Sequence, residues 1–129
     1  RAENKRTERM GRLFASWGIP SVTSLLNCVQ SCTGLPVIAS GGIRSGLDIA
    51  RSIALGASVA ASARPLLQAA TVSTEAVIGE IEFFGESLRT AMFLTGARDI
   101  QALAGVSFSL TDSLRPPVYE GGRSGPGLS

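Results

Sequence analysis

The chain has 129 residues, of which 44% are hydrophobic, and its 12 Lys and Arg slightly outnumber its 10 Asp and Glu. This composition is typical of a globular chain with an apolar core, and the length fits one domain. The longest apolar candidate for a membrane helix, residues 76–94, is interrupted by four charged side chains, whereas a spanning helix needs roughly 18 uninterrupted apolar residues. These features disfavour a membrane protein, and we expect a soluble, cytoplasmic one.

Residues 1–16 form a charged lead-in of helix or loop, with five basic side chains against two acidic ones. The segment has no initiating Met and no targeting pattern, so we expect a fragment of a longer chain. A basic cluster can bind nucleic acid, but the chain has one Tyr, one Trp and no second basic stripe. A solvated helix face is the better interpretation, and no nucleic-acid partner is expected.

The stretch "WGIP", residues 17–20, predicts a turn, and Pro20 suits the first turn of a helix that continues to about Cys32. Apolar residues recur along this helix at spacings of three and four: Val22, Leu25, Leu26 and Val29. Cys28 and Cys32 share one helix face, but the chain lacks His, and two thiols cannot complete a structural zinc site. We expect buried, unpaired thiols and no metal site, and their role stays open.

The run "LPVIAS", residues 35–40, is short, apolar and rich in β-branched residues, which predicts a strand buried on both faces. Gly41 and Gly42 follow it directly. Ser45 with Asp48 three residues later is a capping-box pattern, which predicts a helix from about residue 45 to 55.

A second strand is predicted at residues 57–63, "ASVAASA", although its Ala content would also suit a helix. Pro65 then begins a short helix to about Ala70, and Ser73 caps a long one that ends at Gly96. The long helix carries an apolar stripe of Val77, Ile81, Phe84, Leu88 and Ala91. The sequence predicts one or two further helical turns at residues 98–104 and a flexible tail at residues 105–129.

Two strands joined by a helix are parallel, so the fold class is α/β. The order of strand, glycine loop, helix, strand and short helix suits the C-terminal part of a (β/α)₈ TIM barrel, with residues 17–104 as the barrel segment. In such barrels the last two strands commonly hold a phosphate between their loops and a short extra helix. Gly41 and Gly42 permit positive φ and a close approach of backbone N–H groups, while Arg44 and Arg64 offer guanidinium groups. The alternative is a tight turn without a ligand.

The motifs "WGIPS", "LPVIASGGIRSGLDIARSIALGA", "ARP" and "LRTAMFLTGARDIQAL" occur in order over residues 9–104. Together they resemble the type 2 isopentenyl-diphosphate isomerases, FMN-dependent enzymes with a TIM barrel. "GGIR" and "ARP" are also similar to segments of the α-hydroxy-acid oxidases. Those two motifs therefore indicate the flavin phosphate more strongly than the reaction.

The resemblance implies that the FMN phosphate is held by Gly41, Gly42, Ile43 and Arg44 after one strand and by Ala63 and Arg64 after the next. It also implies interconversion of isopentenyl and dimethylallyl diphosphate, in which reduced flavin relays the proton, NADPH reduces the FMN and Mg²⁺ holds the diphosphate. A homotetramer or homooctamer is implied as well.

The family's catalytic and substrate-binding residues are expected upstream of this chain, which contains no His. The second strand, "SVAASARP", is richer in Ala and Ser than that of the family, which would weaken packing near the phosphate. Trp17 could line the active-site mouth or serve packing alone. The alternatives are an FMN-dependent α-hydroxy-acid oxidase, which would require a His-containing loop upstream of residue 1, and a truncated chain without activity.

Overall fold

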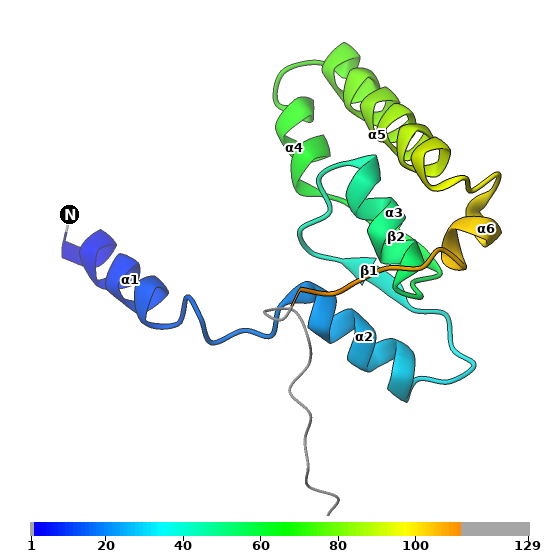
Figure 1. Cartoon of the computed structure of the whole chain (residues 1–129). Coiled ribbons are helices and arrows are strands. Elements are labelled where there is room, and N and C mark those ends of the chain that lie inside the picture. Colours follow the sequence, from blue (N-terminus) through cyan, green and yellow to red (C-terminus); the bar gives the residue numbers. More distant parts are fainter. Residues whose placement is uncertain (1, 112–129) are drawn as a thin grey trace, which may run out of the picture.

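The computed structural model describes residues 2–111. Its elements are α1 (Ala2–Leu13), α2 (Ser21–Ser31), β1 (Ile38–Ser40), α3 (Gly46–Ala54), β2 (Val59–Ala61), α4 (Arg64–Ala70), α5 (Thr74–Thr95) and α6 (Ile100–Ala104). The two strands pair in parallel, with Ile38 opposite Val59 and Ser40 opposite Ala61, and α3 connects them (Figure 1). The predicted parallel βαβ unit is therefore confirmed.

The strands are shorter and more exposed than predicted. Each has three residues, and Pro36, which has no N–H for a ladder hydrogen bond, lies two residues before β1. Burial on both faces is wrong: Ala39 is buried, but the side chains of Ile38 and Val59 are 63% and 52% exposed. Within residues 2–111, helices cover only one face of the sheet, whereas parallel strands of α/β proteins are normally covered on both.

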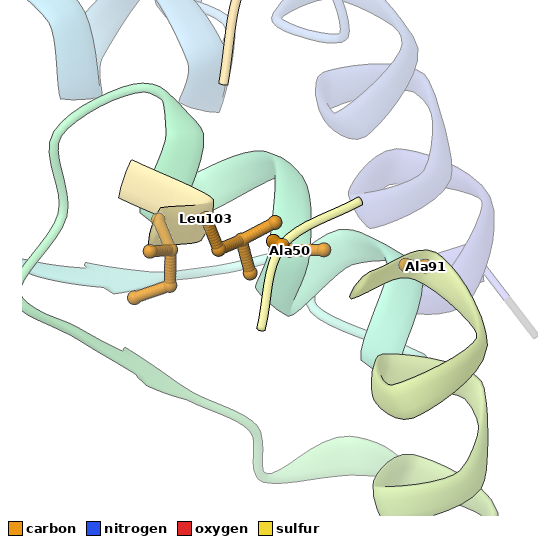
Figure 2. Packing of buried hydrophobic residues seen from close by; sticks show 5 residues of the cluster. Ala50, Ala91 and Leu103 are labelled. Atoms are coloured by element: carbon orange, nitrogen blue, oxygen red, sulfur yellow. The ribbon is translucent and has the colours of Figure 1, made fainter. Parts of the chain in front are cut away.

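The main core lies where α3, α5 and α6 meet, and Figure 2 shows Ala50, Ala91 and Leu103 from these helices. Leu103 is 2% exposed and packs among small side chains, which let the helices approach closely. The buried members of this cluster are Ala50, Ile53, Ala91, Ala97 and Leu103. A second, smaller cluster joins α2 to the strands through Leu25, Ala39 and Ala57.

The predicted stripe of α5 is confirmed in part: Ala91 is buried, Val77, Phe84 and Leu88 are half-buried, and Ile81 is 56% exposed. The first residue of α3, Gly46, meets α5 at Phe84 and Leu88, and later residues of α3 pack near Ala91. The contact with α3 therefore starts at Phe84, and Ile81 lies one turn before it.

The predicted helix ends are confirmed with one small shift. The side chains of Ser45 and Ser73 accept the backbone N–H groups three residues later in α3 and α5. Gly96 follows α5 with φ +71°, and Pro65 lies in the first turn of α4. Pro20 immediately precedes α2 instead of lying in its first turn, so its ring still costs no helical hydrogen bond.

The two ends of the described range differ in how they relate to the main core. In Figure 1, α1 projects from the rest of the molecule, and Trp17 is 82% exposed, with its ring 5.9 Å from that of Phe14. Residues 105–111 have no regular structure, but Val106 packs against the main core. The other residues of the predicted tail lie outside the described range, and the division at residues 16 and 104 stays a prediction.

The cysteines are unpaired, as predicted, but their predicted burial is wrong. Cys28 is exposed and Cys32 half-buried, because α2 contacts the strands mainly through Leu25 and Val29. No helix within residues 2–111 combines the length and the apolar character that crossing a bilayer requires.

Candidate functional site

The six residues predicted to bind a phosphate lie on two neighbouring loops. Because β1 and β2 are parallel, their carboxyl ends lie at the same edge of the sheet. Residues 41–44 leave β1 at this edge, and residues 63–64 leave β2 there and enter α4. The topology thus brings together residues that are about twenty positions apart in the sequence.

Gly41 and Gly42 have the backbone conformation that the doubled glycine predicts. Their φ angles are +86° and +84°, in the left-handed region that strains any residue with a Cβ. A Cβ at Gly42 would meet no atom within 4 Å, and one at Gly41 would meet only Oγ of Ser21, at 3.8 Å. The backbone here is therefore constrained by conformation and not by packing, and the open space leaves room for a ligand.

Hydrogen bonds hold the far end of this loop. The hydroxyl of Ser62 donates to the carbonyl oxygen of Ile43 at 2.7 Å, and the N–H of Arg44 donates to Oδ2 of Asp48 at 3.0 Å. The N–H groups of Gly42 and Ile43 make no hydrogen bond within residues 2–111. The free backbone donors of the loop are therefore those of Gly42 and Ile43, and Arg44 can reach an anion only through its guanidinium.

Arg44 and Arg64 line one pocket of about 350 Å³, together with Pro65 and Gln68. Neither guanidinium forms an ion pair with a carboxylate of the described residues. α4 begins at its N-cap, Ala63, without a side-chain hydrogen bond to its first N–H groups. Two unpaired guanidinium groups that line one pocket suit an anion such as a phosphate.

A larger hollow of about 1050 Å³ lies between α2, β1, α3 and residues 106–111, and its end reaches the glycine loop. Its walls are mostly apolar, and their one cationic side chain, Arg51, lies 3.6 Å from the Asp48 carboxylate. The unpaired guanidinium groups thus line the smaller pocket, while Gly42 and Ile43 lie at the end of the larger hollow. Residues 2–111 contain no group of three or more potential metal-ligating side chains.

Sequence reasoning missed the role of Ser62. The residue counted only as part of an Ala- and Ser-rich strand with weak packing, but its hydroxyl ties the loop after β1 to the end of β2. The sequence signals only the hydroxyl side chain, between two alanines at a strand end, and not the partner that it bonds. Asp48 was expected to cap α3, and its bond to the Arg44 N–H was not expected.

The parallel βαβ unit, with its glycine loop and short helix at the carboxyl edge, is an α/β arrangement of the kind found at the last two strands of TIM barrels. Residues 12–109 match the model of the FMN-dependent dehydrogenase family. The chain belongs to this family.

Comparison with curated relatives shows which enzymes the chain resembles in sequence. The chain is 43% identical over 115 residues to the isopentenyl-diphosphate delta-isomerase of Archaeoglobus fulgidus, covering 89% of this chain and 32% of that protein. It is 44% identical over 116 residues to the isomerase of Methanothrix thermoacetophila, covering 90% of this chain and 32% of that protein. The predicted resemblance to these isomerases is confirmed, and the chain spans about a third of their length.

Solved structures with the same arrangement include mandelate oxidases. One, a variant with a monooxide FMN adduct, superimposes with a TM-score of 0.68 at 32% identity over 73% of this chain and 31% of that one. Another, with benzoyl-formic acid, gives a TM-score of 0.67 at 33% identity, covering 72% of this chain and 28% of that one. They support the barrel class that the glycine loop predicts.

Proposed function

We propose that this chain supplies the FMN-phosphate site of an FMN-dependent isopentenyl-diphosphate isomerase. The observation that carries the proposal is the edge where β1 and β2 end. The loop after β1 has two glycines with positive φ and the free N–H groups of Gly42 and Ile43, and the unpaired guanidinium groups of Arg44 and Arg64 line a pocket at the same edge. The family match to FMN-dependent dehydrogenases supports FMN as the phosphate's source.

The residues of this edge would act on the phosphate in two ways. The N–H groups of Gly42 and Ile43, beside the open backbone of Gly41, would donate hydrogen bonds to phosphate oxygens. Arg44 and Arg64 would balance the charge of the phosphate, and the N–H groups at Ala63 and Arg64 would add donors from the start of α4. The bound flavin would supply the proton relay of the isomerisation, and this chain would position it.

The relatives favour the isomerase over the oxidase alternative. Identity to the isomerases is 43% over 89% of the chain, against 32% over 73% for the mandelate oxidase variant. The oxidase resemblance is therefore strongest at the level of the fold. We place the catalytic residues outside this chain and expect the 129-residue chain alone to lack isomerase activity.

The remaining features of the proposal are supported by the resemblance to the isomerases alone. They are reduction of FMN by NADPH, Mg²⁺ as the ion that holds the isopentenyl or dimethylallyl diphosphate, a homo-oligomeric assembly and a cytoplasmic location. The proposed division of the chain is a lead-in at residues 1–16, the barrel segment at 17–104 and a tail at 105–129.

A comparison of FMN with riboflavin tests the proposed phosphate site, because riboflavin lacks the phosphate. We expect the chain to bind FMN at least about tenfold more tightly, since one charge-assisted hydrogen bond contributes about 1.5–3 kcal/mol. Flavin fluorescence titrations measure both affinities. Equal affinity for FMN and riboflavin would refute the phosphate site.

Two substitutions locate the site. Gly42→Val should abolish the preference for FMN, because a branched side chain resists positive φ and fills the space over the free N–H groups. Gly34→Val is the matched control: Gly34 has φ +82° and equally open space, but lies before β1, at the opposite edge of the sheet. This variant should keep the preference.

Arg44→Ala tests how much the Arg44 guanidinium contributes to FMN affinity. Because Arg44 is exposed, we expect a loss of only about three- to tenfold in FMN affinity. If Arg44→Ala abolished FMN binding while Gly42→Val left it intact, the proposed dominance of backbone donors would be wrong.

A further inference from the structure

The peptide group between Ile43 and Arg44 is held at both of its polar ends. Its carbonyl oxygen accepts the Ser62 hydroxyl at 2.7 Å, and its N–H donates to Oδ2 of Asp48 at 3.0 Å. Ser62 follows β2, while Asp48 lies in the first turn of α3. Two elements that border the proposed site therefore fix the orientation of one peptide plane between them.

Asp48 is itself fixed. Its Oδ2 also accepts the Ser45 hydroxyl at 3.1 Å, and its Oδ1 lies 3.6 Å from Nη1 of Arg51. The Asp48 side chain is only 29% exposed, so α3 presents this carboxylate to the loop in a defined position. The Ser62 hydroxyl is likewise part-buried.

Gly41 and Gly42 need such support. Glycine has the largest backbone freedom of any residue, and a loop that begins with two of them has many conformations to lose when it orders around a ligand. A peptide plane fixed just after the glycines reduces that freedom before the ligand arrives. Such preorganisation strengthens binding by lowering the entropy lost on association.

We propose that Ser62 and Asp48 are positioning residues for the phosphate, which clamp the Ile43–Arg44 peptide so that the N–H groups of Gly42 and Ile43 are held ready for it. This inference rests on the proposed function, because it assumes that the anion at this edge is the phosphate of FMN. It adds that Ser62 joins the two loops into one site, although its side chain need not touch the ligand.

Ser62→Ala isolates the clamp, because it removes one hydroxyl and leaves the guanidinium groups and the glycines unchanged. A hydrogen bond of this kind predicts about three- to tenfold weaker FMN binding, with riboflavin affinity unchanged. Ser62→Thr keeps a hydroxyl and should restore FMN affinity. Ser58→Ala is the control: Ser58 is exposed and lies at the amino end of β2, so its loss should change neither affinity.

Amide hydrogen exchange of the ligand-free chain, followed by NMR, gives a second measurement that does not depend on flavin. The Arg44 N–H should be protected in the parent chain and should exchange several-fold faster in Ser62→Ala, but not in Ser58→Ala. An Arg44 N–H that exchanges equally fast in the parent and Ser62→Ala chains would overturn the clamp.

The outcomes separate the two proposals. A parent chain that binds FMN no better than riboflavin refutes the proposed function, and the clamp with it. A parent chain that prefers FMN, with a Ser62→Ala variant of the same preference, refutes the clamp and leaves the proposed function standing. Equal weakening of FMN and riboflavin by Ser62→Ala would show a merely structural role for Ser62 and would also overturn the inference.

Discussion

Gly46→Ala is predicted to be the most damaging single-methyl addition among the glycines of the described residues. Gly46 is the first residue of α3 and lies directly against α5. A Cβ at this position would overlap the backbone nitrogen of Leu88, the backbone oxygen of Phe84 and Oγ of Ser87, all well inside 3.0 Å. Two of these three atoms belong to the backbone of a helix and cannot rotate away, so α3 and α5 would have to separate.

The expected loss of stability follows from the contacts that a separation of α3 and α5 would disrupt. Overpacking in a core costs about 1–3 kcal/mol and occasionally more, and the hydrogen bond from the Gly46 N–H to Ser87 Oγ, at 2.8 Å, would be stretched as well. We expect a loss of about 3 kcal/mol in the free energy of unfolding. For a chain of this size, that loss lowers Tm by roughly 10 °C.

Thermal unfolding followed by circular dichroism at the helix band measures the effect. Gly79→Ala is the matched control, because Gly79 lies within α5 and a Cβ there would meet no atom within 4 Å. That variant should gain about 0.5–1 kcal/mol from the higher helix propensity of Ala. A Gly46→Ala chain that melts at or above the parent's Tm would refute the packing argument.

Three further predictions follow. Leu103→Ala should cost about 2–5 kcal/mol in denaturant unfolding, because Leu103 is 2% exposed, while Leu67→Ala, at a position 68% exposed, should cost little; equal losses would contradict the assigned core. The pKa of Glu75 lies below its ordinary value because the carboxylate accepts a hydrogen bond from its own backbone N–H and another from Ser73. Ionised Glu75 therefore stabilises the fold at neutral pH, and this contribution is lost as the pH falls through its lowered folded-state pKa. An NMR titration that gives Glu75 a normal or raised pKa would contradict this prediction. The 129-residue chain with FMN, NADPH and Mg²⁺ should convert no isopentenyl diphosphate, and detectable conversion would show that the catalytic groups lie within it.

Local patterns in the sequence predicted the elements well, because each is marked by residues that act locally. Ser45 and Ser73 cap helices through bonds three residues away, and Gly96 ends one through its own φ. Burial was predicted less well, because it depends on what covers a residue. Ile38 has the character of a residue buried in a central strand, yet it is 63% exposed within the described range.

The residue types of the candidate site could be predicted from the sequence, but the hydrogen bonds that connect them could not. The doubled glycine and the two arginines are visible in the sequence, and parallel pairing of the strands places them at one edge. The bond between Ser62 and Ile43 spans 19 residues, and no local pattern links two such positions. The hydrogen bond from the Arg44 N–H to Asp48 could not be predicted for a different reason. A capping-box pattern does not show which backbone N–H donates to the acidic side chain.

The motif "GGIRSG" contains glycines that are required for different physical reasons. Gly42 has open space around it and is required for its φ, whereas Gly46 is required because α5 leaves no room for a Cβ. The two requirements meet at Asp48: the bond of Gly46 to Ser87 fixes where α3 begins on α5, and α3 in turn carries the carboxylate that holds the Arg44 N–H. The packing of α5 thus extends through α3 to the glycine loop. A substitution at Gly46 should therefore weaken FMN binding as well as the fold, although Gly46 lies in the contact between two helices.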